Sequence, residues 1–333
     1  MPCHPRPIPP PADSRTINRM RRNFHMIQTA AMIGMGAIGT VYGHRLFQQY
    51  GSRFRVAAGG DREERIRGNG LQLNGETFYP AVIHAASAEF APDLLILCVK
   101  NHQLVQAFPL IRACLAPHTI ILPLLNGVTA RDVLQKGFPG QTVFYGLSMG
   151  IDAVRSAAGV VNRTDGMIQF GYRDNRIPAP EVTAVRDYLA AAGIDARIMP
   201  DMVHATWKKW MLNVGLNQVS ALTGAQYGHI SAIPEIHTLF VDAMEEALAV
   251  AQAKGIPLSH RDLEELDHMM ETFPKIGKTS LLQDVEAGRD TEAGCFAGTV
   301  LDLGQEYGIP TPVNRVFFNL IKAREGIRRT PLE

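Results

Sequence analysis

Three polar residues recur at every fourth position of an otherwise apolar segment: Lys209, Asn213 and Asn217. On an α-helix each step of four residues turns the side-chain direction by only about 40°, so the three side chains would share one stripe. A lysine there could donate a proton to a carbonyl oxygen as a hydride reaches the carbon, while the amides orient the substrate. The spacing equally fits a helix edge in solvent whose asparagines bond to a neighbouring loop.

A glycine motif near the start of the chain indicates a dinucleotide site. Gly34, Met35, Gly36, Ala37, Ile38 and Gly39 fit the pattern G-x-G-x-x-G, directly after an apolar run and at the opening of a helical pattern. In this motif the first glycine permits a tight turn, the second lets the backbone approach a pyrophosphate, and the third allows close packing of helix on strand. Free N–H groups at the helix N-terminus would then face the phosphates.

The residues after the expected second strand bear on the choice between NAD and NADP. Asp61 could accept a hydrogen bond from a ribose 2′-hydroxyl, whereas Arg62 or Arg65 could bind a 2′-phosphate in a bidentate fork. We expect NADPH with Arg62 as a cofactor-binding residue, and NAD remains the alternative. All three side chains also suit the solvated start of a helix.

The elements that would position these residues fall into two groups. Buried strands are expected at 27–33, 55–58, 94–99 and 119–125, helices at 37–50, 62–67, 102–115 and 130–135, antiparallel hairpins appended to the sheet within 143–172, then a helix at 181–192 and a strand at 196–199. After residue 200 only helical periodicity is found, at 203–223, 233–253, 260–271, 281–287, 291–307 and 312–324. The pattern predicts an α/β Rossmann-type N-terminal domain, residues 26–200, followed by an all-α C-terminal domain, residues 201–333.

Composition and charge exclude several classes of function. The 333 residues are 46% hydrophobic, which is enough for a sizeable core. Their net charge of +1 provides no broad positive electrostatic field that would attract nucleic acid or an anionic membrane surface. No apolar run is long enough for a membrane span, the four cysteines lack zinc spacing, and the histidines show no metal-binding pattern, so we expect no metal. Residues 1–25 contain six prolines and are interpreted as a disordered leader. We expect the protein to be cytoplasmic and to bind a small molecule.

Several ordered motifs together resemble the ketopantoate reductase family, NADPH-dependent enzymes of pantothenate synthesis. Besides the glycine motif they are Val99-Lys100 with Gln103, Leu125-Asn126-Gly127-Val128, Trp207 to Gly224, Thr279 to Asp284, Glu286 to Arg289, Thr291-Glu292, and Gly308 to Pro312. The resemblance covers the chain from about Met26 onward. It implies reduction of a 2-oxo acid to a 2-hydroxy acid, with 2-dehydropantoate as the substrate, in a cleft between the two domains. It also implies that the helical domain serves substrate binding and dimerisation.

The resemblance also assigns roles to residues. Lys209 matches the general acid, Asn213 and Asn217 match substrate-side asparagines, and Ser280 matches a serine that binds the substrate carboxylate. Glu292 matches a glutamate near the lysine, the substrate and the cofactor, Asn126 an asparagine near the nicotinamide and the substrate, and Lys100 and Gln103 residues on the cofactor side. Without the family pattern, Lys100 and Glu292 would read as surface charges and Ser280 as a helix cap.

Departures from the family leave alternatives open. Gly294 and Ala297 stand where the family often has polar pocket residues, and Gly59 stands where it often has an arginine after the second strand. The first pair favours a paralogous reductase for a different 2-oxo acid, and Gly59 bears on the NADP preference. A non-catalytic NADP-binding sensor is a third reading, against which Lys209 and Glu292 count. The oligomeric state stays open, with a homodimer among the states allowed.

Overall fold

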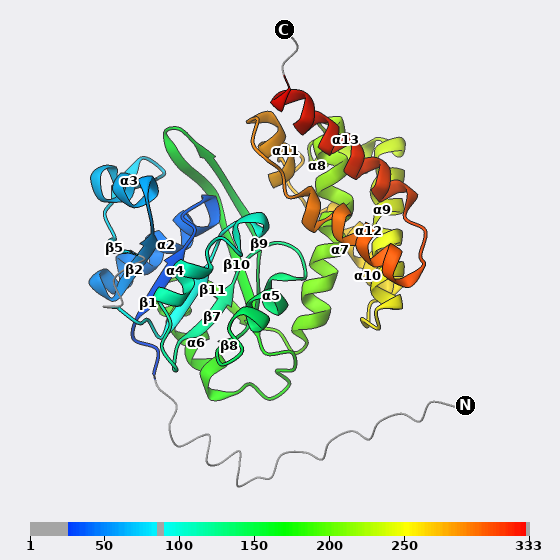
Figure 1. Ribbon diagram of the computed structural model, residues 1–333. Helices are drawn as coiled ribbons and strands as arrows, with labels where there is room; N and C mark the ends of the chain where they lie inside the picture. The colour runs from blue at the N-terminus through cyan, green and yellow to red at the C-terminus, as the bar shows by residue number, and fades with distance from the viewer. Residues whose placement is uncertain (1–25, 85–89, 331–333) are drawn as a thin grey trace.

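The computed structural model of the chain describes residues 26–84 and 90–330, so the predicted leader lies outside the described residues. Figure 1 shows an α/β part and a helical part side by side, with the long helix of the second part between them. The predicted fold class, a Rossmann-type N-terminal part followed by an all-helical part, is confirmed.

The first sheet has six parallel strands whose core residues are apolar. They are β1 (Ala30–Ile33), β2 (Phe54–Ala58), β5 (Ala81–His84), β6 (Leu94–Leu97), β7 (Ile120–Pro123) and β8 (Thr142–Val143). The spatial order is β5-β2-β1-β6-β7-β8, which is the order of Rossmann folds. The chain adds strands on one side of β1 up to β5 and then on the other side from β6 onward, so the switch point lies between β1 and β6. Ligands of such sheets bind outside the carboxyl ends of the strands at this switch point, so the loops after β1 and β6 become the region of interest.

Helices cover both faces of this sheet because successive side chains of a strand point to opposite sides. Ala30 and Met32 of β1 pack with the core under α2 (Ala37–Tyr50) and α6 (Pro180–Ala191), and Ala31 and Ile33 pack with the core under α4 (Phe108–Ala113) and α5 (Ala130–Gly137). The burial of β1 on both faces is why it reads as a continuous apolar run.

One predicted helix, 102–115, is wrong in extent. The structure has a short 3-10 turn, η2 (Asn101–Gln103), and then α4, which begins at Phe108 with Pro109 in its first turn. Proline lacks the N–H that a continuous helix needs and is tolerated only in the first turn. The break leaves residues 100–103 as a tight loop directly after β6.

The hairpin within 143–172 is confirmed, but its predicted place in the sheet is wrong. β9 (Tyr145–Ser156) pairs antiparallel with β10 (Gly159–Gly171), and β10 pairs with β11 (Asp195–Ile198) and β3 (Leu71–Leu73) in a second sheet. This sheet is completed by β4 (Glu76–Phe78), and β3 and β4 are strands that the sequence analysis missed. The long hairpin brings β9 against the helix that follows residue 200.

After Ile198 all regular elements in the described part of the chain are helical. They are α7 (Met202–Thr223), α8 (Tyr227–Ala232), α9 (Pro234–Ala253), α10 (His260–Met270), α11 (Ser280–Glu286), η3 (Ala293–Cys295), α12 (Ala297–Tyr307) and α13 (Pro312–Arg329). The predicted helix 291–307 begins later, at Ala297, because Phe296 leaves helical geometry at φ −105°, ψ −96°. Glu292 therefore lies on a loop before η3 rather than inside a helix.

Helix α7 forms the centre of the helical part. Its first turn is capped by the Asp201 carboxylate, which accepts hydrogen bonds from the N–H groups of Val203 and His204. Trp210, Met211 and Val214 are almost fully buried in the core beneath it. Within the described ranges, no helix is both long enough and apolar enough to cross a membrane.

Candidate active site

The glycine loop after β1 lies against the end of β6. Gly34 has φ +98°, and a Cβ there would lie 2.5 Å from the carbonyl carbon of Cys98 and 2.6 Å from the nitrogen of Val99. Only glycine allows both the backbone angle and this close approach. The first position of the motif thus joins the two strands at the switch point of the sheet.

The other two glycines meet different surroundings. Gly36 precedes α2, and a Cβ built on it meets no atom within 4 Å. A Cβ on Gly39 would lie 2.1 Å from the carbonyl oxygen of Gly34, so this position needs glycine for packing of helix on strand. Met35 is buried, and Ala37 and Ile38 are partly buried in the first turn of α2. The backbone at Gly36 is therefore the part of the loop open to a ligand.

A cavity of about 340 Å³ opens beside this loop. Its lining includes Gly34, Met35, Gly59, Arg62 and Gln103, together with apolar side chains of β2 and α4. Four predicted cofactor residues, Gly34, Met35, Arg62 and Gln103, thus share one cavity at the switch point. The cavity lies at the switch point of the sheet, which is where sheets of this topology bind dinucleotides.

Two further arginines lie near Arg62, which lines this cavity. Arg62 and Arg65 are exposed on α3 (Asp61–Asn69), and Arg65 Nε donates to the Asp61 carbonyl oxygen at 3.3 Å. Burial lowers the pKa of Arg155, at the end of β9, and the positive charges of Arg62 and Arg65 lower it further. The hairpin therefore adds a third positive charge near α3, which the sequence analysis did not foresee.

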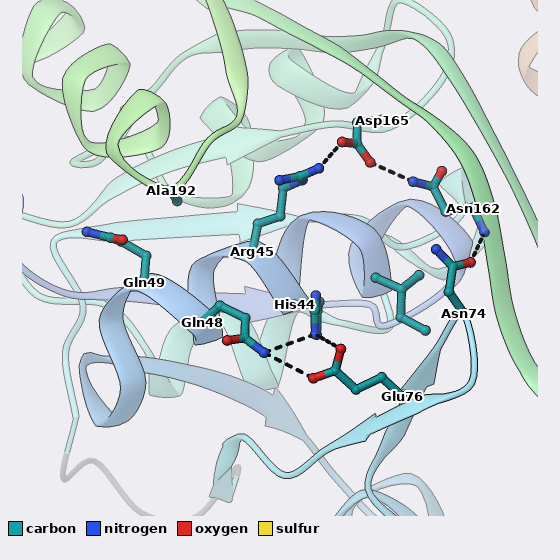
Figure 2. Close-up of a pocket in the computed structure, with 10 residues that line it drawn as sticks. His44, Arg45, Gln48, Gln49, Asn74, Glu76, Asn162, Asp165 and Ala192 are labelled. Carbon is teal, nitrogen blue, oxygen red and sulfur yellow. Dashed lines mark hydrogen bonds and ion pairs between the residues drawn. The ribbon is translucent and has the colours of Figure 1, made fainter.

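A second cavity, of about 380 Å³, lies on the outer side of α2 (Figure 2). Its polar groups pair with one another: Gln48 Nε2 donates to Glu76 at 3.2 Å, His44 lies 3.5 Å from the same carboxylate, and Arg45 forms an ion pair with Asp165. The charged side chains that line this cavity are therefore paired with side chains of opposite charge in the same cavity. It contains none of the predicted site residues.

Lys209 lies at the meeting point of the two parts of the chain. Its Nζ donates to the carbonyl oxygen of Ser148 in β9 at 2.6 Å and lies 3.4 Å from Oδ1 of Asn126, in the loop after β7. Burial lowers the pKa of Lys209 to about 8, although the negative charge of Glu292 acts in the opposite direction. A lysine with such a pKa can exchange a proton near neutral pH.

Glu292 and Asn126 are joined directly. Asn126 Nδ2 donates to Oε2 of Glu292 at 3.0 Å, so one asparagine bridges the lysine and the glutamate. Residues 126, 209 and 292, which the family resemblance grouped, thus form one hydrogen-bonded cluster between the α/β and helical parts.

Lys100 lies in a different environment from Gln103. Gln103 lines the cavity, whereas Lys100 Nζ bonds across to the helical part, to Oδ2 of Asp284 at 2.6 Å and to the Asp290 carbonyl oxygen at 3.1 Å. In this structure Lys100 therefore joins the two parts.

The remaining predicted substrate residues carry free polar groups. Asn213 and Asn217 follow Lys209 by one and two steps of four along α7, Asn213 partly buried and Asn217 only 5% exposed. Ser280 is exposed at the start of α11, whose cap is Thr279 and not Ser280. Within the described residues none of these three side chains has a hydrogen-bond partner. Their amides and hydroxyl remain available for a substrate.

Two residues of the cluster escaped the sequence analysis. Ser148 contributes only a backbone oxygen, which carries no residue signature, and Asn101 reaches Glu292 across 191 positions of the chain. In the described ranges no three His, Cys, Asp or Glu side chains are arranged to hold a metal ion.

The fold and the cluster define a Rossmann-type protein with a helical C-terminal part and a lysine-centred site between the two. Comparison with family models then identifies the family. The family model described as "Ketopantoate reductase PanE/ApbA" matches residues 30–175, and the model described as "Ketopantoate reductase PanE/ApbA C terminal" matches residues 201–325. The chain belongs to the ketopantoate reductase family, which is a family of oxidoreductases.

Individual relatives agree with this assignment. The chain is 26% identical over 302 residues to a 2-dehydropantoate 2-reductase of Streptococcus pyogenes, covering 88% of this chain and 97% of the relative. The crystal structure of 2-dehydropantoate 2-reductase from Methylococcus capsulatus superposes with a TM-score of 0.77 at 27% identity, covering 91% and 99% of the two chains. A D-mandelate dehydrogenase solved with NADH and anilino(oxo)acetate has the same fold, with a TM-score of 0.82 at 23% identity over 91% of this chain and 100% of that one.

Proposed function

We propose that this chain is an NADPH-dependent reductase that converts a 2-oxo acid to a 2-hydroxy acid, with 2-dehydropantoate as the substrate to test first. The supporting observation is the cluster of Lys209, Asn126 and Glu292, which is bonded to Asn101 in the loop after β6, while the glycine loop lies against the end of the same strand. We also propose a division after residue 200 into a cofactor domain and a helical domain for substrate binding and self-association.

The cofactor would be held by the glycine loop, Arg62 and Gln103, with Asn126 and Glu292 on its nicotinamide side. When bound, a reduced nicotinamide supplies the hydride that the substrate carbonyl carbon accepts. Lys209 donates the proton that the carbonyl oxygen takes up, so the carbonyl gains one hydride and one proton. Asn213, Asn217 and Ser280 offer unpartnered amides and a hydroxyl for the carboxylate and the remaining substrate groups. Lys100 stays a proposed cofactor-side residue.

A panel of 2-oxo acids assayed at 340 nm with NADPH and with NADH tests the proposal. Turnover of 2-dehydropantoate well above the other acids supports it. Preference for another 2-oxo acid supports the alternative of a paralogous reductase with a different substrate. Gly294 favours this alternative, because it is exposed and an added Cβ would meet no atom within 4 Å. Cofactor binding without any turnover would indicate a sensor. Light scattering during size-exclusion chromatography tests whether the protein is a homodimer, and fractionation tests the cytoplasmic location.

The pH dependence of kcat/KM should report Lys209. A general acid works only while protonated, and burial lowers the pKa of Lys209 to about 8. We therefore expect kcat/KM to be level below this pH and to fall about tenfold per unit well above it. Lys209→Arg keeps its proton throughout and should remove this fall. A wild-type profile level from about pH 7 to 9.5 would contradict the role of Lys209.

Cofactor preference should depend modestly on the α3 arginines. The double variant Arg62→Ala with Arg65→Ala should lower the ratio of kcat/KM for NADPH to that for NADH by about three- to tenfold, because exposed ion pairs are screened by solvent. Arg176→Ala is a suitable control, since Arg176 is exposed and pairs with Asp174 outside the site. An unchanged ratio would mean that neither side chain reads the 2′-phosphate, and Asp61 would be tested next.

A further inference from the structure

The carboxylate of Glu292 is held by three N–H donors, two of them from Asn101. Oε1 accepts from the backbone N–H of Asn101 at 3.0 Å and from its Nδ2 at 3.2 Å. Oε2 accepts from Nδ2 of Asn126 at 3.0 Å. Both donor residues lie on loops at the carboxyl ends of β6 and β7, so the α/β part fixes a side chain of the helical part.

Asn101 also holds Asn126, which contacts Lys209. Its Nδ2 donates to the carbonyl oxygen of Asn126 at 2.7 Å, and Oδ1 of Asn126 faces Lys209 Nζ at 3.4 Å. The structure records no bond between Asn101 and Lys209. Asn101 can thus influence the lysine only through Glu292 and Asn126.

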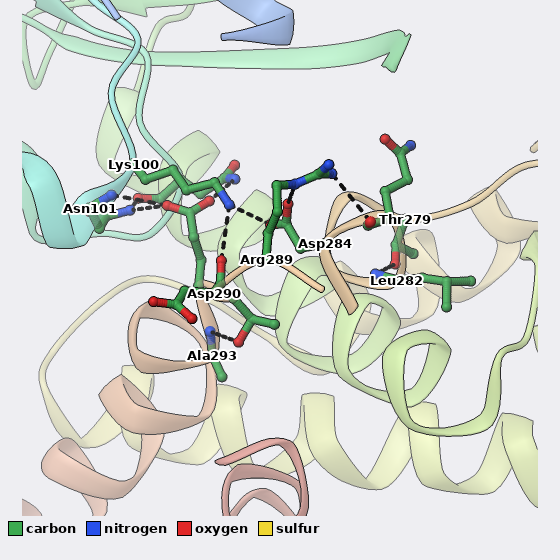
Figure 3. Close-up of polar contacts among 12 residues, drawn as sticks. Lys100, Asn101, Thr279, Leu282, Asp284, Arg289, Asp290 and Ala293 are labelled. Atoms are coloured by element: carbon green, nitrogen blue, oxygen red, sulfur yellow. Dashed lines mark hydrogen bonds and ion pairs between the residues drawn. The ribbon is translucent and has the colours of Figure 1, made fainter. Parts of the chain in front are cut away.

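The adjacent residue anchors the segment that leads to Glu292. Figure 3 shows Lys100 and Asn101 facing Asp284, which lies in α11, and Arg289 and Asp290, which lie on the loop after α11. Lys100 bonds to Asp284 at 2.6 Å, and the other oxygen of that carboxylate accepts from Arg289 Nε at 2.8 Å. Residues 100 and 101 therefore hold this segment at two places, and Asn101 holds the end that bears Glu292.

We propose that Asn101 is a positioning residue that holds Glu292 in the orientation in which its negative charge acts on Lys209. The inference rests on the proposed function of this site. The charge of Glu292 raises the pKa of Lys209 against the effect of burial. Without the Asn101 side chain the carboxylate keeps the backbone N–H but loses the Nδ2 donor, and Asn126 loses the bond that holds its carbonyl oxygen. A carboxylate held less firmly moves or becomes hydrated, and its electrostatic effect on the lysine weakens.

Asn101→Ala tests this role through both rate and pH profile. We expect kcat for the accepted 2-oxo acid to fall about tenfold, and the fall in kcat/KM at high pH to begin about half a unit lower than in wild type. Asn101→Asp, which places a second carboxylate against Glu292, should lower kcat further. The control is Asn319→Ala, an exposed asparagine of α13, which should leave both unchanged. A pH profile that does not move in Asn101→Ala would overturn the proposal, whatever happens to kcat. A loss of packing alone can lower kcat, but it does not shift the pH at which kcat/KM falls.

A second measurement does not depend on turnover. In thermal unfolding, Asn101→Ala should lower Tm in the wild-type background and lower it less in Glu292→Ala, since the bond to Glu292 is then already gone and only the bond to the Asn126 carbonyl oxygen remains to be lost. Additive losses in the double variant would overturn the link between the two residues. If the wild-type protein reduces no 2-oxo acid, the proposed function fails, whereas this coupling is still measured.

Discussion

Replacing Lys209 with alanine should lower kcat for the accepted 2-oxo acid by at least about a hundredfold, since a positioned acid contributes roughly a hundred- to ten-thousandfold. Nζ is the proton-bearing atom of the cluster, and it lies 2.6 Å from the Ser148 carbonyl oxygen and 3.4 Å from Asn126 Oδ1. The dissociation constant of the cofactor should change little, because the glycine loop is formed by β1 and α2. Steady-state rates and a fluorescence titration with NADPH measure the two quantities.

The adjacent lysine supplies the matched control. Lys208 points about 100° away from Lys209 around the helix and pairs on that side with Asp262 at 3.2 Å and with Glu265. Lys208→Ala should retain nearly wild-type kcat. Equal effects of the two substitutions, or full kcat in Lys209→Ala, would reject the assignment of the proton donor.

Gly36→Ala should weaken cofactor binding by roughly ten- to a hundredfold, the cost of losing one charge-assisted hydrogen bond to a phosphate. A methyl group there meets no protein atom within 4 Å, so the fold has room for it. It would instead occupy the space in which a pyrophosphate approaches the backbone. We expect an unchanged Tm without cofactor, and a raised Kd in a titration with NADPH.

Gly39→Ala distinguishes this effect from a general disturbance of the loop. Its Cβ would lie 2.1 Å from the Gly34 carbonyl oxygen, so the variant should unfold several degrees lower or accumulate poorly. An unaltered Kd in a well-folded Gly36→Ala variant would show that the cofactor does not approach this part of the backbone.

The parts of the fold that were predictable are those with a local signal. Strands β1, β6 and β7 are buried on both faces and read as apolar runs, and the stripe of Lys209, Asn213 and Asn217 follows from helical periodicity alone. Strands β3 and β4 are only three residues long and show little alternation. The Asn74-Gly75 pair between them, with φ of 50° and 85°, is a hairpin signal that could have located both.

The missing parts of the site depend on contacts distant in sequence. Asn101 meets Glu292 across 191 positions, and Arg155 approaches α3 only because β10 pairs with β3 at Val160 and Leu73. Neither residue belongs to a motif. Ser148 acts through its backbone, so no residue pattern at that position could reveal it.

The hydrogen bonds that cross between the two parts limit how this protein can be recombined with its relatives. A chimera with a foreign helical part, joined after residue 200, would import its own counterparts of Lys209 and Glu292. The acceptor at Ser148 is a backbone carbonyl and would be present whatever residue stands there, whereas the donors to Glu292 come from the side chains of Asn101 and Asn126 as well as one backbone N–H. A functional graft therefore requires parents matched at positions 101 and 126, and tolerates divergence at 148.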